Sequence, residues 1–295
     1  MRKNDKDAGG NRARIWKIAS MAFLVAAIVC TVVACAGKAK QEDAEDQYES
    51  LAEQTTKVVV EETPEPSAES SEGSEASEEE PEEEVDPLKA LEDMGIPVPE
   101  KQVDFDNLQE TVNKDIYAWI YIPDTAVDYP ILQHPTDNTY YLNYNLDGSR
   151  GYPGCIYTED YNAKDFTDPV TVVYGHNMKD GSMFAGLHKY ADSEYMESHP
   201  YVYIYTPDSL LVYEIFTAHE TTDEHILYAH NWFEEKSVLE DYIKDISDAR
   251  IMGSVLREDV EVDGDDCILT LSTCISTKPN NRFVVQGVLL NASEE

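Results

Sequence analysis

The sequence has little positive charge. Of its 295 residues, 22 are lysine or arginine and 59 are aspartate or glutamate, which gives a formal net charge of −37. A protein this acidic repels the phosphates of DNA and RNA, so we expect no nucleic-acid partner. It also repels anionic lipid, so contact with a membrane would require a dedicated anchor.

The sequence also lacks the spacings that usually hold metal ions. It contains five cysteines and seven histidines, yet no Cys-x-x-Cys pair and no two histidines at metal-binding spacing. The acidic clusters show no calcium-binding spacing either. We therefore predict no metal and no other cofactor.

Long uncharged apolar runs are absent with one exception. The nineteen residues from Ile18 to Ala36 carry no charge, and as a helix they would span about 28 Å, close to the thickness of a hydrocarbon core. Basic residues dominate positions 1–17, so the positive-inside rule places this N-terminal segment in the cytoplasm. We predict a single-pass transmembrane anchor at 18–36, with the rest of the chain outside the cell.

Two alternatives stay open for this apolar segment. One is a signal peptide that is cleaved after export. The other is a lipoprotein signal, because Val32-Val33-Ala34-Cys35 resembles a bacterial lipoprotein cleavage box, which would leave a lipid on Cys35. Anchor and lipid both place the following domain outside, at the membrane surface.

Residues 37–87 have the composition of a linker. Glutamate, serine, proline and alanine dominate, and between positions 41 and 87 nineteen acids accompany one lysine, Lys57. Such a stretch cannot bury enough apolar surface to offset the entropy lost on ordering. We predict a disordered acidic linker over 37–87 and a folded domain over 88–295.

Short strands dominate the pattern of the folded domain. Aromatic and β-branched residues form runs that end at turn residues such as Pro123-Asp124. Eight runs without an internal repeat predict a closed barrel or a sandwich, and therefore a mostly β fold. The runs are Tyr117–Ile122, Ala126–Leu132, Gly154–Thr158, Val170–Tyr174, Tyr201–Thr206, Leu210–Ala218, Ile268–Thr273 and Phe283–Leu290.

Helices are expected in a few places only. The sequence predicts N-terminal helices over residues 88–94 and 105–113, before the first strand. The longest helix is predicted over 231–250, where apolar residues recur every three or four positions and Asn231 provides an N-cap. This helix should pack one face on the barrel.

Three residues that can carry chemistry stand at predicted strand ends. Cys274 ends the run that starts at Ile268, Arg282 begins the next run, and His176 comes two residues after Tyr174. A thiol, an imidazole and a fixed cation are the parts of a cysteine transferase or protease. The thiolate is the attacking form, and a nearby cation favours it.

The other two cysteines of the domain suit a structural role. Cys155 and Cys267 lie in strand-like surroundings, where a cysteine packs as a small hydrophobic residue. A disulfide between them is the alternative. Three cysteines in an exported domain cannot all pair within it, and Cys274 is then the thiol left to react.

These segments resemble a known family. Tyr174-Gly175-His176-Asn177-Met178, Gly181-Ser182-Met183-Phe184 and Thr270-Leu271-Ser272-Thr273-Cys274, followed by Arg282, are similar to the motifs of sortases and occur in the same order. The stretches 113–120, 127–133 and 137–142, with a long helix between the sixth and seventh strands, most resemble class B. The resemblance covers residues 88–295 and implies an eight-stranded sortase-like β-barrel with N-terminal helices.

The resemblance implies transpeptidation at the surface of a Gram-positive bacterium. Sortases cut a C-terminal sorting signal of a surface protein and join the new carboxyl end to a peptidoglycan amine, in a precursor or a cross-bridge. The family's catalytic roles fall on His176, Cys274 and Arg282. Cys274 would attack the carbonyl, His176 would transfer protons, and Arg282 would stabilise the oxyanion or hold substrate carbonyls.

Substrate choice is only weakly encoded. Class B enzymes typically recognise short signals that open with Asn-Pro or a related pair and continue to threonine. Ser272 and Thr273 could hold the strand end and the substrate by hydrogen bonds, and Tyr228 is a candidate aromatic contact. These three are our predicted substrate-binding residues.

Two other functions stay open from sequence. A secreted cysteine peptidase would use the same cysteine and histidine with water as the acceptor. A non-catalytic surface scaffold would explain the acidic linker equally well, and its Cys274 would react no faster than a model thiol.

Overall fold

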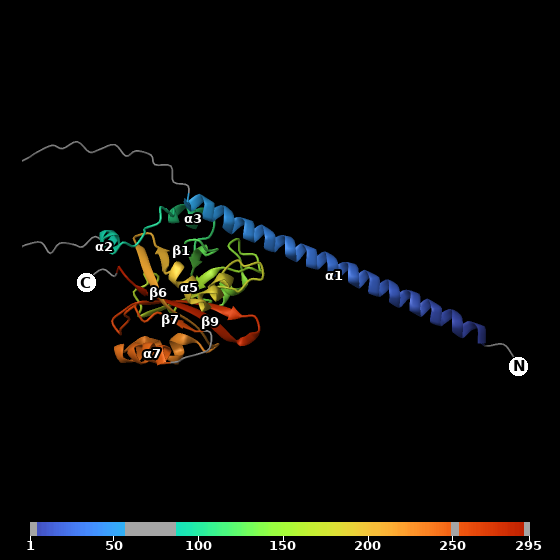
Figure 1. Cartoon of the computed structure of the whole chain (residues 1–295). Coiled ribbons are helices and arrows are strands. Elements are labelled where there is room, and N and C mark those ends of the chain that lie inside the picture. Colours follow the sequence, from blue (N-terminus) through green and yellow to red (C-terminus); the bar gives the residue numbers. More distant parts are fainter. Residues whose placement is uncertain (1–4, 57–86, 249–253, 292–295) are drawn as a thin grey trace, which may run out of the picture. The chain divides into compact units, whose positions relative to one another are not determined.

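The computed structural model describes residues 5–56, 87–248 and 254–291. The chain divides into two compact units, residues 1–47 and 48–295. In the first unit the described residues belong to helix α1 (Asp5–Thr56). The second unit holds the end of α1 and every described strand (Figure 1).

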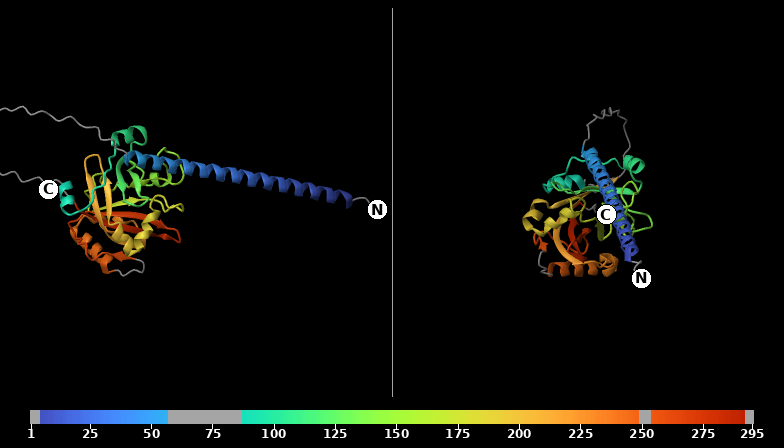
Figure 2. Two further views of the ribbon diagram at one scale, coloured as in Figure 1. Left: turned by 45° about the horizontal axis from the view of Figure 1, so that its top comes forward. Right: turned by 90° about the vertical axis from the view of Figure 1, so that its right-hand side faces the viewer.

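A nine-stranded sheet in the described part of the second unit closes into a barrel (Figure 2). Neighbouring strands pair in the order β5-β1-β2-β3-β4-β8-β9-β6, and β5 pairs with β6 to close the ring. The short β7 (Val255–Leu256) pairs with β6 outside this ring. The expected eight-stranded closed barrel is thus confirmed. Its strands are β1 (Ile116–Tyr121), β2 (Asp128–Leu132), β3 (Ile156–Thr158), β4 (Val170–Tyr174), β5 (Tyr201–Tyr205), β6 (Leu210–Thr222), β8 (Ile268–Ile275) and β9 (Lys278–Leu289).

Strand β1 illustrates how buried side chains hold neighbouring strands of the barrel together. Ile116 to Ile120 are all buried, so both faces of this strand are covered. Trp119 is fully buried, and its indole Nε1 donates to Asp128 Oδ1 of β2 at 2.6 Å. The buried Lys101 ammonium lies 2.8 Å from the same carboxylate, which balances its charge. Burial of a large apolar side chain such as that of Trp119 stabilises the fold by roughly 2–3 kcal/mol.

Short helices lie between the strands. Helix α3 begins after Asp104, whose carboxylate accepts from the Asn107 backbone N–H at 2.9 Å and so caps the helix. The helices after α1 are α2 (Pro87–Asp93), α3 (Phe105–Thr111), α4 (Tyr140–Asn143), η1 (Ala185–Ala191), α5 (Ser193–Ser198), α6 (Ile226–Ala229), η2 (Asn231–Phe233) and α7 (Lys236–Asp248).

Helix α7 covers one face of the barrel and forms a second apolar core there (Figure 1). Leu239 and Tyr242 of the helix share this core with Val172 and Ile268 of the sheet. The helix lies between β6 and β8, which are the sixth and seventh predicted strands, as expected, but its predicted start at Asn231 is wrong. Residues 231–233 have φ between 48° and 60°, a left-handed conformation that cannot continue a right-handed helix. The predicted end at 250 lies outside the described residues.

The predicted linker is wrong in its first part. Residues 37–56 belong to α1, and Tyr48 and Leu51 are buried in the core of the second unit. The Tyr48 hydroxyl donates to the Gly154 carbonyl at 2.7 Å, and the Lys101 ammonium donates to Thr55 Oγ1 at 2.6 Å. The average composition of the segment does not reveal that Tyr48 and Leu51 are buried, and their burial holds the end of the helix in place. Residues 57–86 lie outside the described residues.

Within the described ranges, no helix combines the length and the apolar character needed to cross a membrane.

Burial of His219 should make folding depend on pH. This β6 imidazole is 7% exposed, and burial lowers its pKa from 6.5 to about 4. The unfolded chain therefore binds a proton more readily, and stability should fall as the pH drops from about 6.5 to 4, by at most about 3 kcal/mol. Urea unfolding at pH 7.5 and 4.5 should show a smaller loss in His219→Phe than in the unsubstituted protein. Equal losses would contradict this.

Candidate active site

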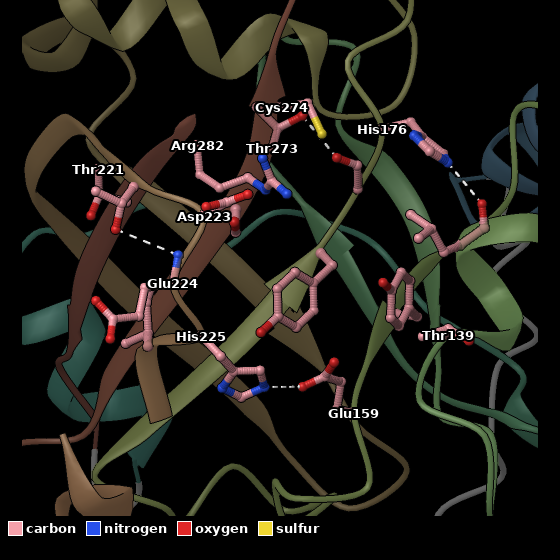
Figure 3. Close-up of a pocket in the computed structure, with 17 residues that line it drawn as sticks. Thr139, Glu159, His176, Thr221, Asp223, Glu224, His225, Thr273, Cys274 and Arg282 are labelled. Carbon is pink, nitrogen blue, oxygen red and sulfur yellow. Dashed lines mark hydrogen bonds and ion pairs between the residues drawn. The ribbon is translucent and has the colours of Figure 1, made fainter. Parts of the chain in front are cut away.

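Strand register brings His176, Cys274 and Arg282 to one edge of the sheet. β4 runs parallel to β8 with Tyr174 opposite Ser272, so His176 and Cys274, each two residues further along, lie at the same end of the two strands. β9 runs antiparallel to β8 with Arg282 opposite Cys274. All three line one cleft with a volume of about 250 Å³ (Figure 3).

His176 is oriented by a backbone carbonyl. Its Nε2 lies 2.8 Å from the Leu142 oxygen. A carbonyl can only accept, so Nε2 carries a proton, and Nδ1 is the basic nitrogen of the neutral ring. The ring also packs edge-on against Tyr152, with centroids 5.2 Å apart. Among the described residues it forms no hydrogen bond to Cys274; such contacts often tighten only when substrate binds.

Two glycines let the chain pass close to His176. A Cβ on Gly175 would lie 2.5 Å from Ile156 Cδ1, inside contact distance. Gly154 has φ of +69°, and a Cβ there would lie 2.9 Å from the Tyr141 carbonyl oxygen and 3.4 Å from Cδ2 of His176. A side chain at either position would therefore displace the segment that holds the imidazole.

Cys274 differs from the other cysteines of the second unit in its exposure. It is exposed, whereas Cys155 is buried and Cys267 half-buried, and none of the three forms a disulfide. The alternative of a Cys155–Cys267 disulfide is therefore wrong. Burial raises the pKa of Cys155 to about 12 and also raises the pKa of Cys267. Both therefore remain protonated thiols at neutral pH. Cys274 is the exposed thiol among these three cysteines.

Arg282 presents a cation to the cleft. Its Nη1 donates to the backbone carbonyls of Pro279 and Asn281 at 3.1 and 3.0 Å. Within the described part of the chain no carboxylate forms an ion pair with it. The guanidinium has further N–H donors besides Nη1, so the side chain is anchored and still able to bind an oxygen of a substrate.

Phenols and carboxylates also line the cleft. Tyr157 and Tyr174 stack with centroids 5.4 Å apart, and burial raises the pKa of both hydroxyls. They therefore stay protonated at neutral pH and can donate hydrogen bonds. Glu159 bonds to His225 at 2.5 Å across the cleft wall (Figure 3). In the part of the chain that the structure describes, no group of three or more potential metal ligands is placed to hold an ion.

The predicted substrate-binding residues fall into two groups. Ser272 and Thr273 line the cleft, and Thr273 Oγ1 donates to the Gly175 carbonyl at 2.8 Å, so this hydroxyl ties β8 to the segment before His176. Tyr228 lies beside the cleft rather than in its lining. It is 52% exposed and packs edge-on against Trp232 with centroids 4.5 Å apart.

Sequence reasoning missed two sets of residues. No sequence pattern assigns a role to His188 or His225, yet His225 lines the cleft and His188 Nε2 lies 3.1 Å from the Cys274 carbonyl oxygen. Asn177 occurs in the motif around His176 without an assigned role, and its amide donates to the Cys274 carbonyl at 2.9 Å. The only local signal was the position of Asn177 directly after His176.

Comparison with known proteins agrees with this geometry. Residues 120–290 match the family model of the sortase domain. Sortase B of Listeria monocytogenes is 40% identical over 183 residues, which cover 61% of this chain and 72% of the relative. Sortase B of Staphylococcus aureus is 30% identical over 186 residues, covering 62% and 74%.

Solved structures show the same relationship in three dimensions. The structure of sortase B from Listeria monocytogenes matches with a TM-score of 0.53 at 40% identity, over 62% of this chain and 99% of that one. A Staphylococcus aureus sortase B–substrate complex matches with a TM-score of 0.56 at 29% identity, over 64% and 85%. The chain therefore belongs to the sortase family of cysteine transpeptidases and is most similar to class B.

Proposed function

We propose that this enzyme cleaves a C-terminal sorting signal of a surface protein and transfers the new carboxyl end to an amine of cell-wall peptidoglycan. The observation that carries the proposal is the meeting of Cys274, His176 and Arg282 at one sheet edge and in one cleft. The signal we propose is Asn-Pro-x-Thr-like. A sortase B–substrate complex of a relative that is 29% identical supports the proposal that this enzyme binds a substrate of the same kind.

Cys274 is the proposed nucleophile and His176 the proton carrier. Cys274 gives its thiol proton to Nδ1 of His176, the resulting thiolate attacks the scissile carbonyl, and His176 passes that proton to the departing amine as the C–N bond breaks. The resulting thioester holds the acyl group until an amine arrives. His176 then takes a proton from that amine as it attacks, the C–S bond breaks, and the thiolate is restored.

Arg282 is the proposed oxyanion partner. Each attack places negative charge on the former carbonyl oxygen, and a preorganised donor aimed at that charge lowers the barrier. The two backbone contacts of Nη1 hold the guanidinium in place before substrate binds. A guanidinium offers several N–H donors in a fixed fork and no acceptor, which suits an oxyanion.

We also propose that residues 18–36 hold the enzyme in the cell membrane, with 1–17 in the cytoplasm and the catalytic domain outside. The uncharged run and the basic residues before it support this. The catalytic domain would then meet surface proteins as they are exported. In this proposal the catalytic unit starts at Tyr48 rather than at 88, which the burial of Tyr48 and Leu51 in its core supports.

Replacing the nucleophile should abolish the covalent intermediate. Mass spectrometry of the full chain with a panel of sorting-signal peptides should show a thioacyl adduct on Cys274 and, with an amine present, an amine-linked product. Cys274→Ala should lose both, with turnover lowered by at least about 10³-fold. Cys267→Ala, which removes a half-buried thiol, should keep both. Product that forms at the same rate and with water as acceptor whether or not amine is added would instead indicate a peptidase.

Arg282 should be needed for the chemical step. Loss of one oxyanion donor lowers kcat by about 10²–10³-fold, and Arg282→Ala should fall in this range. Lys278→Met is the matched control, because it removes a cation from the same strand that is paired with Glu220 at 2.7 Å. Steady-state kinetics should show little change in Lys278→Met. Equal losses in the two variants would point to a general effect of charge.

Removal of residues 1–36 should release the enzyme from the membrane. Fractionation of cells should place the full chain with membranes and a variant that starts at residue 37 in the soluble exported fraction, if it is given a cleavable export signal. Cys35→Ala separates a helical anchor, which it leaves in place, from a lipid anchor, which it removes. A full chain recovered wholly in the soluble fraction would contradict the anchor.

A further inference from the structure

The backbone carbonyl of Cys274 is bound by two side chains. Asn177 Nδ2 lies 2.9 Å from this oxygen and His188 Nε2 lies 3.1 Å from it. Asn177 directly follows His176, and His188 belongs to η1. The peptide of the proposed nucleophile is therefore tied both to the chain segment of the proposed acid–base and to a separate helix.

The chemistry of the acceptor decides which atoms donate. A carbonyl oxygen has two lone pairs and no proton, so it can accept from both side chains, and Nε2 of His188 must then carry a hydrogen. Asn177 Nδ2 and His188 Nε2 also lie 3.0 Å apart. In the other tautomer Nε2 would accept from Asn177, but its lone pair would then face the Cys274 carbonyl oxygen at 3.1 Å, so the Nε2–H tautomer is the one that satisfies the carbonyl. The reverse amide orientation would set an Asn177 oxygen against the carbonyl oxygen. The neutral Nε2–H form of His188 is sufficient for this arrangement.

The two side chains bind at the place where the regular ladder ends. The pairing of β8 with β9 shifts register between Cys274 and Ile275. Asn177 Nδ2 also lies 3.3 Å from Ser276 Oγ, just beyond the shift. The His188 ring packs against the buried Phe283 with centroids 4.9 Å apart, so it contacts the strand that carries Arg282.

We propose that Asn177 and His188 are positioning residues for the transpeptidase, which hold the Cys274 peptide so that its thiol faces the cleft at a fixed angle to His176 and Arg282. The proposal rests on the assignment of Cys274 as the nucleophile. Neither residue touches substrate in this scheme. Their loss should therefore slow the chemical step and leave binding of the sorting signal nearly unchanged.

The test compares two substitutions of His188 with a control substitution of His199. All are made in the full chain and assayed with a sorting-signal peptide and an amine acceptor. His188→Phe keeps an aromatic ring against Phe283 but removes the donor, and should lower kcat and the single-turnover rate of thioacylation about tenfold, with KM within twofold. His188→Gln offers an N–H donor again and should recover much of the loss. His199→Phe is the control, because its ring stacks on Tyr195 instead, and should behave as the unsubstituted enzyme.

A second pair of variants tests Asn177 and its coupling to His188. Asn177→Asp keeps the shape but sets a carboxylate oxygen against the Cys274 carbonyl, and should lower kcat at least tenfold. Because both residues act on one oxygen, Asn177→Ala combined with His188→Phe should lose less than the product of the two single losses. Thermal melting of each variant should stay within a few degrees of the unsubstituted protein.

The outcomes separate this inference from the proposed function. Unsubstituted enzyme that forms no thioacyl adduct with any peptide would overturn the function and the inference together. Normal turnover in the unsubstituted enzyme with unchanged kcat in His188→Phe would overturn the inference alone. A loss that appears in KM, or that His188→Gln does not relieve, would also overturn it.

Discussion

The parallel pairing of β4 with β8 is the contact on which the rest of the site depends. Five consecutive residues of each strand are in register, from Val170 opposite Ile268 to Tyr174 opposite Ser272. Beyond the last pair, the Gly175 N–H donates to the Ser272 carbonyl at 3.1 Å, and Thr273 Oγ1 donates back to the Gly175 carbonyl at 2.8 Å. A slip of one residue would turn every following side chain to the other face of the sheet. The imidazole and the thiol would then no longer share a cleft.

One strand thus serves as core at one end and as site at the other. The first six residues of β8, Ile268 to Thr273, are buried, and Cys274 is the first exposed one. Below the cleft, Val172 and Ile268 are covered by Leu239 of α7. This apolar packing fixes the strands far more firmly than the polar contacts of the cleft can, because burial of apolar surface dominates the stability of a fold. The packed end of β8 therefore fixes the position of Cys274 at its exposed end.

Arg282 is a cation in the cleft of a strongly acidic protein. The whole chain carries a net charge of −37, and Glu159, Asp223 and Glu224 line the cleft. Glu159 is paired with His225 at 2.5 Å, which leaves its carboxylate less available to Arg282. Arg282 is held instead by neutral carbonyls. A cation that is not neutralised by a carboxylate keeps its full attraction for a developing oxyanion.

The sequence is enough to predict most of the strands, because runs of aromatic and β-branched residues between turn residues need no distant partner to be recognised. It also determined the order of the motifs around His176, Cys274 and Arg282. The folded structure sets the features that depend on contacts between residues far apart in the sequence. It ordered α1 as far as Thr56 through the buried Tyr48 and Leu51, and it began α7 at Lys236, after three residues with positive φ.

Tertiary structure also decided which polar groups meet. His188 and Cys274 are 86 residues apart in the sequence, and Asn177 and Cys274 are 97 apart. No periodicity or local spacing links such positions, because periodic patterns report only which face of an element is buried. Only the closure of the barrel brings η1, the segment after β4 and the end of β8 to one carbonyl oxygen.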